Sequence, residues 1–81
     1  MRIFDGVQHS KAKPIMRNTI KVERAKLNIT QQELADRVGV SRQTINSIES
    51  ERYIPSTLLA IKISNVFQLT VNEIFLLEKE D

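Results

Sequence analysis

The chain has 81 residues, enough for one small domain, and a net charge of only +2. It has no cysteine and a single histidine, His9, which excludes a disulfide framework and a Cys/His metal cluster; neither metal nor cofactor is expected. No apolar run approaches the roughly 20 residues of a membrane span, and the N-terminus lacks the apolar core of a signal peptide. A cytoplasmic protein without a membrane partner is expected.

Charge is unevenly distributed along the chain. Residues 1–27 carry seven Lys or Arg against two acidic residues. Residues 28–72 balance at zero, and residues 73–81 carry one Lys against four acidic residues. A basic N-terminal part suits a domain that approaches phosphates from one side. An ordinary solvated surface would show the same charge distribution.

Residues 1–15 show no sustained hydrophobic period, and a flexible extension is expected up to residue 17. A cloning remnant, an upstream translation start and a native arm all fit this segment, and the sequence leaves the three open. The folded domain is expected over residues 18–78, followed by an acidic tail over residues 79–81.

The first helix is expected to begin at Asn18 or Thr19 and to end at Leu27, because residues at helical spacing share one face there. Asn28 follows as a helix end, since asparagine tolerates the left-handed backbone conformation.

The second helix has a complete set of start and stop signals. Thr30 and Glu33 form a Thr-x-x-Glu capping box, in which each side chain accepts from the other residue's backbone N–H. Ile29 and Leu34 occupy the positions of a hydrophobic staple around this cap. Gly39 then predicts the end of the helix, because glycine adopts positive φ without a steric penalty.

A third helix is expected to start at Ser41 and to end near Glu49, with Ser41 as its cap. Ile45 and Ile48 give it a narrow apolar stripe that faces inward. The polar residues left on its outer face are Arg42, Gln43, Asn46 and Ser47.

Two further helices are predicted in the last third of the chain. One runs from Ser56 to Phe67, and another starts at Thr70, where Glu73 completes a second capping box, and continues towards Leu77. Strand signals are absent, since no apolar/polar alternation is sustained. The sequence therefore predicts an all-α domain of five helices.

Two short capped helices joined by a three-residue turn are typical of a helix-turn-helix, whose second helix enters the major groove of DNA. The outer face of the third helix suits that task, because Arg42 can bind guanine O6 and N7, and Gln43 can bind adenine N6 and N7. The alternative is a merely solvated helix face. The capped helix and the turn that precede this helix favour the interpretation that its outer face binds DNA.

The runs TQQELADRVGVSRQTINSIE (30–49), RYIPS (52–56) and LTVNEIF (69–75) resemble the Cro/phage-repressor, or XRE, family of helix-turn-helix domains. The resemblance covers residues 19–75 and implies a compact five-helix fold like that of lambda repressor. It also implies base contacts from Arg42, Gln43, Asn46 and Ser47, and DNA-backbone contacts from Gln31, Ser41, Thr44, Arg52 and Tyr53. Tyr53 serves equally well as a packing residue beneath the loop.

The same resemblance implies an ion pair between Arg24 of the first helix and Glu49 at the end of the third. The alternative is two independent surface charges. A partly buried pair is the expectation, and it would fix the recognition helix to the rest of the domain.

A homodimer is a further expectation. Leu58, Ile61, Leu76 and Leu77 are apolar residues beyond the minimum inward stripes, and an apolar surface can mark a partner interface. The alternative is that Leu76 and Leu77 close the core of the monomer.

The favoured function is a transcriptional regulator, a repressor that binds a two-fold operator in double-stranded DNA. The alternative is an antitoxin or other protein-interaction module that binds a partner protein as well as its operator. An enzyme is not expected, because the sequence lacks a Gly-rich phosphate loop and a spaced carboxylate pair with a basic partner.

Overall fold

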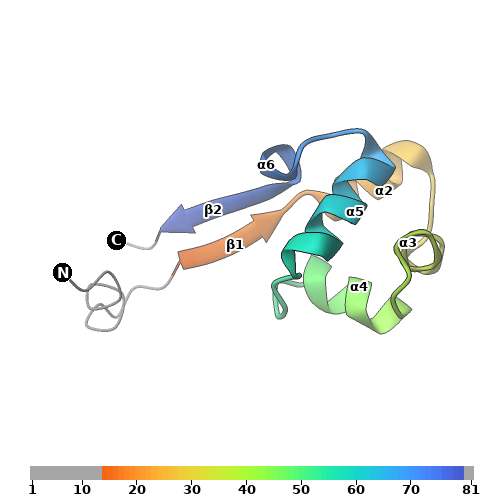
Figure 1. The fold of residues 1–81 in the computed structure, drawn as a ribbon, viewed down its shortest axis with the longest axis horizontal. Coiled ribbons are helices and arrows are strands. Elements are labelled where there is room, and N and C mark those ends of the chain that lie inside the picture. Colours follow the sequence, from red (N-terminus) through yellow and green to blue (C-terminus); the bar gives the residue numbers. More distant parts are fainter. Residues whose placement is uncertain (1–13, 80–81) are drawn as a thin grey trace.

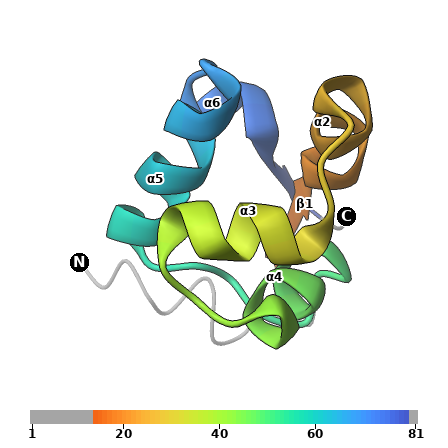
Figure 2. The same cartoon turned by 90° about the vertical axis from the view of Figure 1, so that its right-hand side faces the viewer.

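The computed structural model describes residues 14–79. Its elements in chain order are β1 (Pro14–Asn18), α2 (Ile20–Leu27), α3 (Gln31–Val38), α4 (Arg42–Glu49), α5 (Thr57–Phe67), α6 (Val71–Ile74) and β2 (Phe75–Lys79). The five helices gather into one body, and the two strands leave it together as a ribbon (Figure 1). Viewed from the end opposite the ribbon, α3 and α4 lie next to each other at the surface of the helical body (Figure 2).

Helices α3 and α4 begin and end where the sequence predicts. Thr30 Oγ1 accepts from the Glu33 N–H at 3.0 Å, and Glu33 Oε1 accepts from the Thr30 N–H at 2.8 Å. Gly39 ends α3 with φ of 78°, in the left-handed region that favours glycine. Ser41 Oγ accepts from the Thr44 N–H at 3.1 Å and so caps α4.

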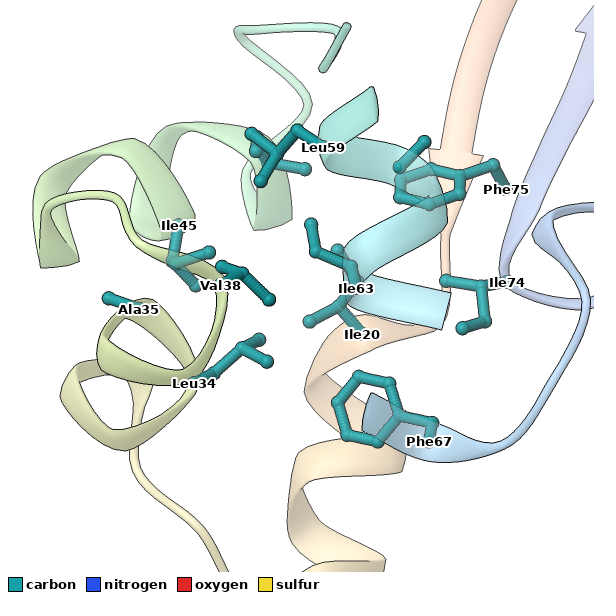
Figure 3. Packing of buried hydrophobic residues seen from close by; sticks show 12 residues of the cluster. Ile20, Leu34, Ala35, Val38, Ile45, Leu59, Ile63, Phe67, Ile74 and Phe75 are labelled. Carbon is teal, nitrogen blue, oxygen red and sulfur yellow. The ribbon is translucent and has the colours of Figure 1, made fainter. Parts of the chain in front are cut away.

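The core takes at least one residue from every helix. Ile20 of α2, Leu34 of α3, Ile45 of α4, Ile63 of α5 and Ile74 of α6 each have an exposed fraction of 0%. Figure 3 shows these side chains converging, with Val38, Leu59, Phe67 and Phe75 around them. Burying each large aliphatic side chain stabilises the fold by about 1.5–3 kcal/mol, so the helices are held mainly by this shared core.

The prediction of an all-α fold is wrong in one respect, because a two-stranded antiparallel sheet joins the two ends of the described chain. Asn18 pairs with Phe75 and Pro14 with Lys79. Residues 14–17, expected in a flexible extension, thus form most of β1, whereas residues 1–13 of that extension lie outside the described residues. Of the expected acidic tail, residue 79 ends β2, and residues 80–81 lie outside the described part.

The last helix is also shorter than predicted. It ends at Ile74, and Phe75 adopts an extended backbone with φ of −104° and ψ of 117°. Residues 75–79 suit a helix by propensity, but pairing with β1 and burial of the Phe75 side chain override that weak local preference. A further link between the two ends is the Thr19 N–H, which donates to the Ile74 carbonyl at 3.0 Å.

No helix within residues 14–79 is long and apolar enough to cross a membrane.

Candidate nucleic-acid interface

Helix α4 is held by its apolar stripe and presents its polar residues outward. Ile45 and Ile48 are buried, with exposed fractions of 0% and 1%. Arg42 and Gln43 are exposed in the first turn of the helix, whereas Asn46 and Ser47 are half-buried one turn later. A helix that enters a groove by its N-terminus would therefore present Arg42 and Gln43 first.

The far end of α4 is fixed by an ion pair. Arg24 Nε lies 2.6 Å from Glu49 Oε2, and Arg24 Nη2 donates to Glu49 Oε1 at 3.1 Å, the pair that the family resemblance implies. The Arg24 and Glu49 side chains have exposed fractions of 15% and 6%. The hydrogen bond to Glu49 is the main cause that raises the pKa of Arg24, while burial acts in the opposite direction.

A third donor reaches the same carboxylate. Gln31 Nε2 donates to Glu49 Oε1 at 3.1 Å, so the first residue of α3 is tied to the last residue of α4. Gln31 was expected to contact the DNA backbone. Its half-buried side chain is directed at Glu49, while its position in the first turn of α3 keeps its backbone N–H among those without an intrahelical partner.

Asn18 is a positioning residue that sequence reasoning missed. Its Nδ2 donates to the Ile48 carbonyl at 2.8 Å, and its Oδ1 accepts from the Ile20 N–H at 3.2 Å. The sequence identifies Asn18 only as a possible start of the first helix. Its bond to α4 spans 30 positions and leaves no local signal.

A shallow depression joins α4 to the loop that follows it. Its lining residues include two of the expected base-contacting residues and four of the expected backbone-contacting residues: Ser41, Gln43, Thr44, Ser47, Arg52 and Tyr53. Arg42, Asn46 and Gln31 are not among them. All the expected contacts except Gln31 thus come from two neighbouring segments, residues 41–47 and 52–53, whose side chains meet at this depression.

The loop after α4 turns at Glu51, whose backbone is in the left-handed conformation, and it is held by two backbone hydrogen bonds. Glu51 has φ of 66°, its N–H donates to the Ile48 carbonyl at 3.0 Å, and the Arg52 N–H donates to the Ser47 carbonyl at 2.9 Å. These two bonds form a Schellman motif, which satisfies the last carbonyls of a helix and usually has glycine at the left-handed position. Tyr53, with an exposed fraction of 49%, is available both for packing and for a phosphate contact.

The four residues expected at a dimer interface are all exposed, with fractions from 41% to 64%. They do not share one surface. Since side chains alternate along a strand and directly paired residues share a face, Leu77 lies with Met16 and Phe75, and Leu76 lies on the opposite face with Arg17. Leu58 lines a depression beside Tyr53.

Known proteins match most of the chain. The helix-turn-helix family matches residues 20–74. An uncharacterized HTH-type transcriptional regulator of Archaeoglobus fulgidus is 50% identical over 66 residues, which cover 82% of this chain and 93% of that protein. YgzD, an uncharacterized HTH-type transcriptional regulator of Bacillus subtilis, is 42% identical over 66 residues, covering 82% of this chain and 100% of YgzD.

A solved structure has a similar fold. A Bacteroides fragilis protein, named as a candidate DNA-binding protein, superimposes with a TM-score of 0.68 at 28% identity, covering 75% of this chain and 98% of that one. The family match spans α2 to α6 and therefore includes the whole of the candidate interface. The chain belongs to the helix-turn-helix family, in its Cro/phage-repressor (XRE) branch.

Proposed function

We propose that this protein is a sequence-specific DNA-binding regulator of transcription, and that it represses by occupying its operator. The observation that carries the proposal is the single surface on which the outer face of α4 meets Arg52 and Tyr53 of the next loop. Relatives that share 42% to 50% of their residues with this chain carry the name of HTH-type transcriptional regulators, which supports the same role here.

In this proposal α4 lies in the major groove, with Arg42 and Gln43 against base edges. Arg can donate two hydrogen bonds to guanine, and Gln can both donate to and accept from adenine. Asn46 and Ser47 reach bases from the second turn. The buried Ile45 and Ile48 keep this face directed outward by fixing the opposite one in the core.

Phosphates on either side of the groove would be held by the residues around this face. Ser41 and Thr44 belong to the start of α4, and Arg52 and Tyr53 belong to the loop after it. Gln31 contributes the N-terminal end of α3, where free backbone N–H groups and the helix dipole attract a phosphate. These contacts orient the protein on the duplex and carry little sequence information.

A second copy of the chain would complete the regulator. An apolar groove of about 290 Å³ lies where the ribbon leaves the helices, lined by Met16, Ile54, Ala60, Val71 and Phe75 among others. Leu77 shares the strand face of Met16 and Phe75, and it is 64% exposed. We propose that this surface, together with Ile61, which follows Ala60 in α5, forms a C2 homodimer that reads two half-sites roughly 34 Å apart.

The same apolar surface supports the second candidate, a module that binds a different protein, such as a toxin, in addition to DNA. The two candidates differ in the partner that covers the groove. A protein that stays monomeric alone at high concentration, and that gains a partner encoded next to it, would favour the second candidate.

A salt series tests the proposed DNA binding. Because phosphate contacts release counterions, the logarithm of the binding constant should fall linearly with the logarithm of salt concentration, with a slope of about −0.9 per contact. A steep slope supports the proposal. Binding that does not depend on salt would contradict it.

A further inference from the structure

Arg52 reaches from the loop back to α4 and contacts one of the proposed base-reading residues. Its Nη2 donates to Asn46 Oδ1 at 3.2 Å, and its Nε donates to Ser50 Oγ at 3.0 Å. Both bonds lie at the surface, beside the depression that Arg52 helps to line. The guanidinium is thus held at two points, and the side chain of Asn46 is one of them.

The direction of every hydrogen bond in this network is determined. Ser50 Oγ donates its only proton to the Ser47 carbonyl at 3.2 Å, so its oxygen is free to accept from Arg52 Nε. A guanidinium has donors and no acceptor, so the oxygen of the Asn46 amide, and not its nitrogen, must face Arg52. The amide orientation therefore follows from the chemistry of its neighbour.

We propose that Arg52 is a positioning residue for base recognition, which holds Asn46 with its amide oxygen engaged and only its Nδ2 donors directed at the DNA. This inference rests on the proposed function, and it adds a determinant of sequence preference to it. The Schellman motif at residues 47–52 keeps Arg52 close enough to α4 for this contact.

The consequence is a specific base preference. A free Asn binds adenine with two bonds, because its oxygen accepts from N6 and its nitrogen donates to N7. In the observed arrangement the Asn46 oxygen already accepts from Arg52, so adenine N6 would have to share that oxygen with a cationic donor group, which weakens the adenine pairing. A group that only donates suits guanine best, whose O6 and N7 are adjacent acceptors, and it disfavours cytosine, whose major-groove edge offers a donor.

The test uses the full chain. Asn46→Ala first identifies the base pair at which the sequence preference is lost. Four duplexes that differ only at that base pair are then compared. We expect the wild-type protein to prefer guanine there. Arg52→Ala should lower the ratio of guanine to adenine affinity by roughly ten-fold, because the freed amide can again pair with adenine. Compared with Arg52→Ala, Arg52→Lys should recover the positive charge and the overall affinity for DNA. It should not recover the ratio of guanine to adenine affinity, since an ammonium lacks the planar fork that engages Ser50 and Asn46 together.

Ser50→Ala is a milder version of the same test, because it removes the hydrogen bond between Ser50 Oγ and Arg52 Nε and leaves both the charge of Arg52 and the Asn46 side chain in place. It should shift the ratio in the same direction as Arg52→Ala, by less. Arg52→Ala that weakens all four duplexes equally would overturn the inference and leave Arg52 as a phosphate contact. An Asn46→Ala variant that changes no base preference would overturn it as well. Both results leave DNA binding intact, whereas salt-independent binding by the wild type would reject the proposed function itself.

Discussion

Arg24 Nε and Glu49 Oε2 lie 2.6 Å apart and join α2, the first helix of the described chain, to the end of the proposed recognition helix. The same carboxylate accepts from Gln31 at 3.1 Å. One buried acidic group therefore sets the position of α4 relative to both α2 and α3. The arrangement makes the recognition helix part of the core structure, even though its outer face is free to contact a ligand.

Arg24→Ala should therefore destabilise the protein by about 3 kcal/mol, because it leaves Glu49 largely buried without its main partner. The double variant Arg24→Met, Glu49→Leu should be more stable than Arg24→Ala, since it leaves no stranded charge. Urea unfolding measures both. An unchanged unfolding midpoint in Arg24→Ala would show that the pair is two independent surface charges.

Glu51→Gly should stabilise the protein by about 1 kcal/mol, because Glu51 has φ of 66° and glycine adopts that conformation without a steric penalty. Ser50→Gly is the comparison: Ser50 has φ of −85°, so glycine relieves no strain there, adds chain entropy to the unfolded state and removes the hydrogen bonds of Ser50 Oγ, and it should destabilise. Thermal unfolding compares the two. Equal effects of both changes would contradict the role given to backbone conformation.

Thr19→Val should also stabilise, by about 1 kcal/mol. Within the described part of the chain, the Thr19 hydroxyl oxygen is buried and has no hydrogen-bond partner, and valine replaces it with a methyl group. Thr19→Ser keeps the hydroxyl and removes packing, so it should not stabilise. A Thr19→Val variant that is less stable than the wild type in urea unfolding would show that the hydroxyl has a partner.

Local signals predicted most of this fold. The Thr30–Glu33 box, Gly39 and Ser41 each act within four residues, and the structure forms α3 and α4 at the places that they indicate. Such signals are readable because their partners are close in sequence.

The ribbon could not be read in the same way. Asn18 and Phe75 pair across almost the whole chain, and neither segment shows an alternating pattern that would predict a strand. The Asn18 contact to the Ile48 carbonyl has the same long-range character. At the candidate interface, the residue types on the outer face of α4 were predictable, whereas the orientation of Asn46 by Arg52 depends on a loop conformation.

The ribbon provides the test of self-association. Leu77→Glu should shift the protein from dimer to monomer in sedimentation, because residue 77 shares the strand face of the apolar groove. Leu76→Glu places the same charge on the opposite face of the ribbon and should leave the dimer intact. A wild-type protein that is monomeric at high concentration, or equal effects of both variants, would contradict the proposed dimer surface.

The central claim is that α4 reads bases while its surroundings hold phosphates. Its most direct test selects bound sites from a random DNA pool and then compares affinity for the selected site and for random DNA. Arg42→Ala and Gln43→Ala should each cost about 1–3 kcal/mol on the selected site and much less on random DNA, while Tyr53→Phe, which removes a hydroxyl proposed to contact a phosphate, should weaken both evenly. Equal losses on both DNAs for all three variants, or no preference of the wild type for any selected site, would contradict the account.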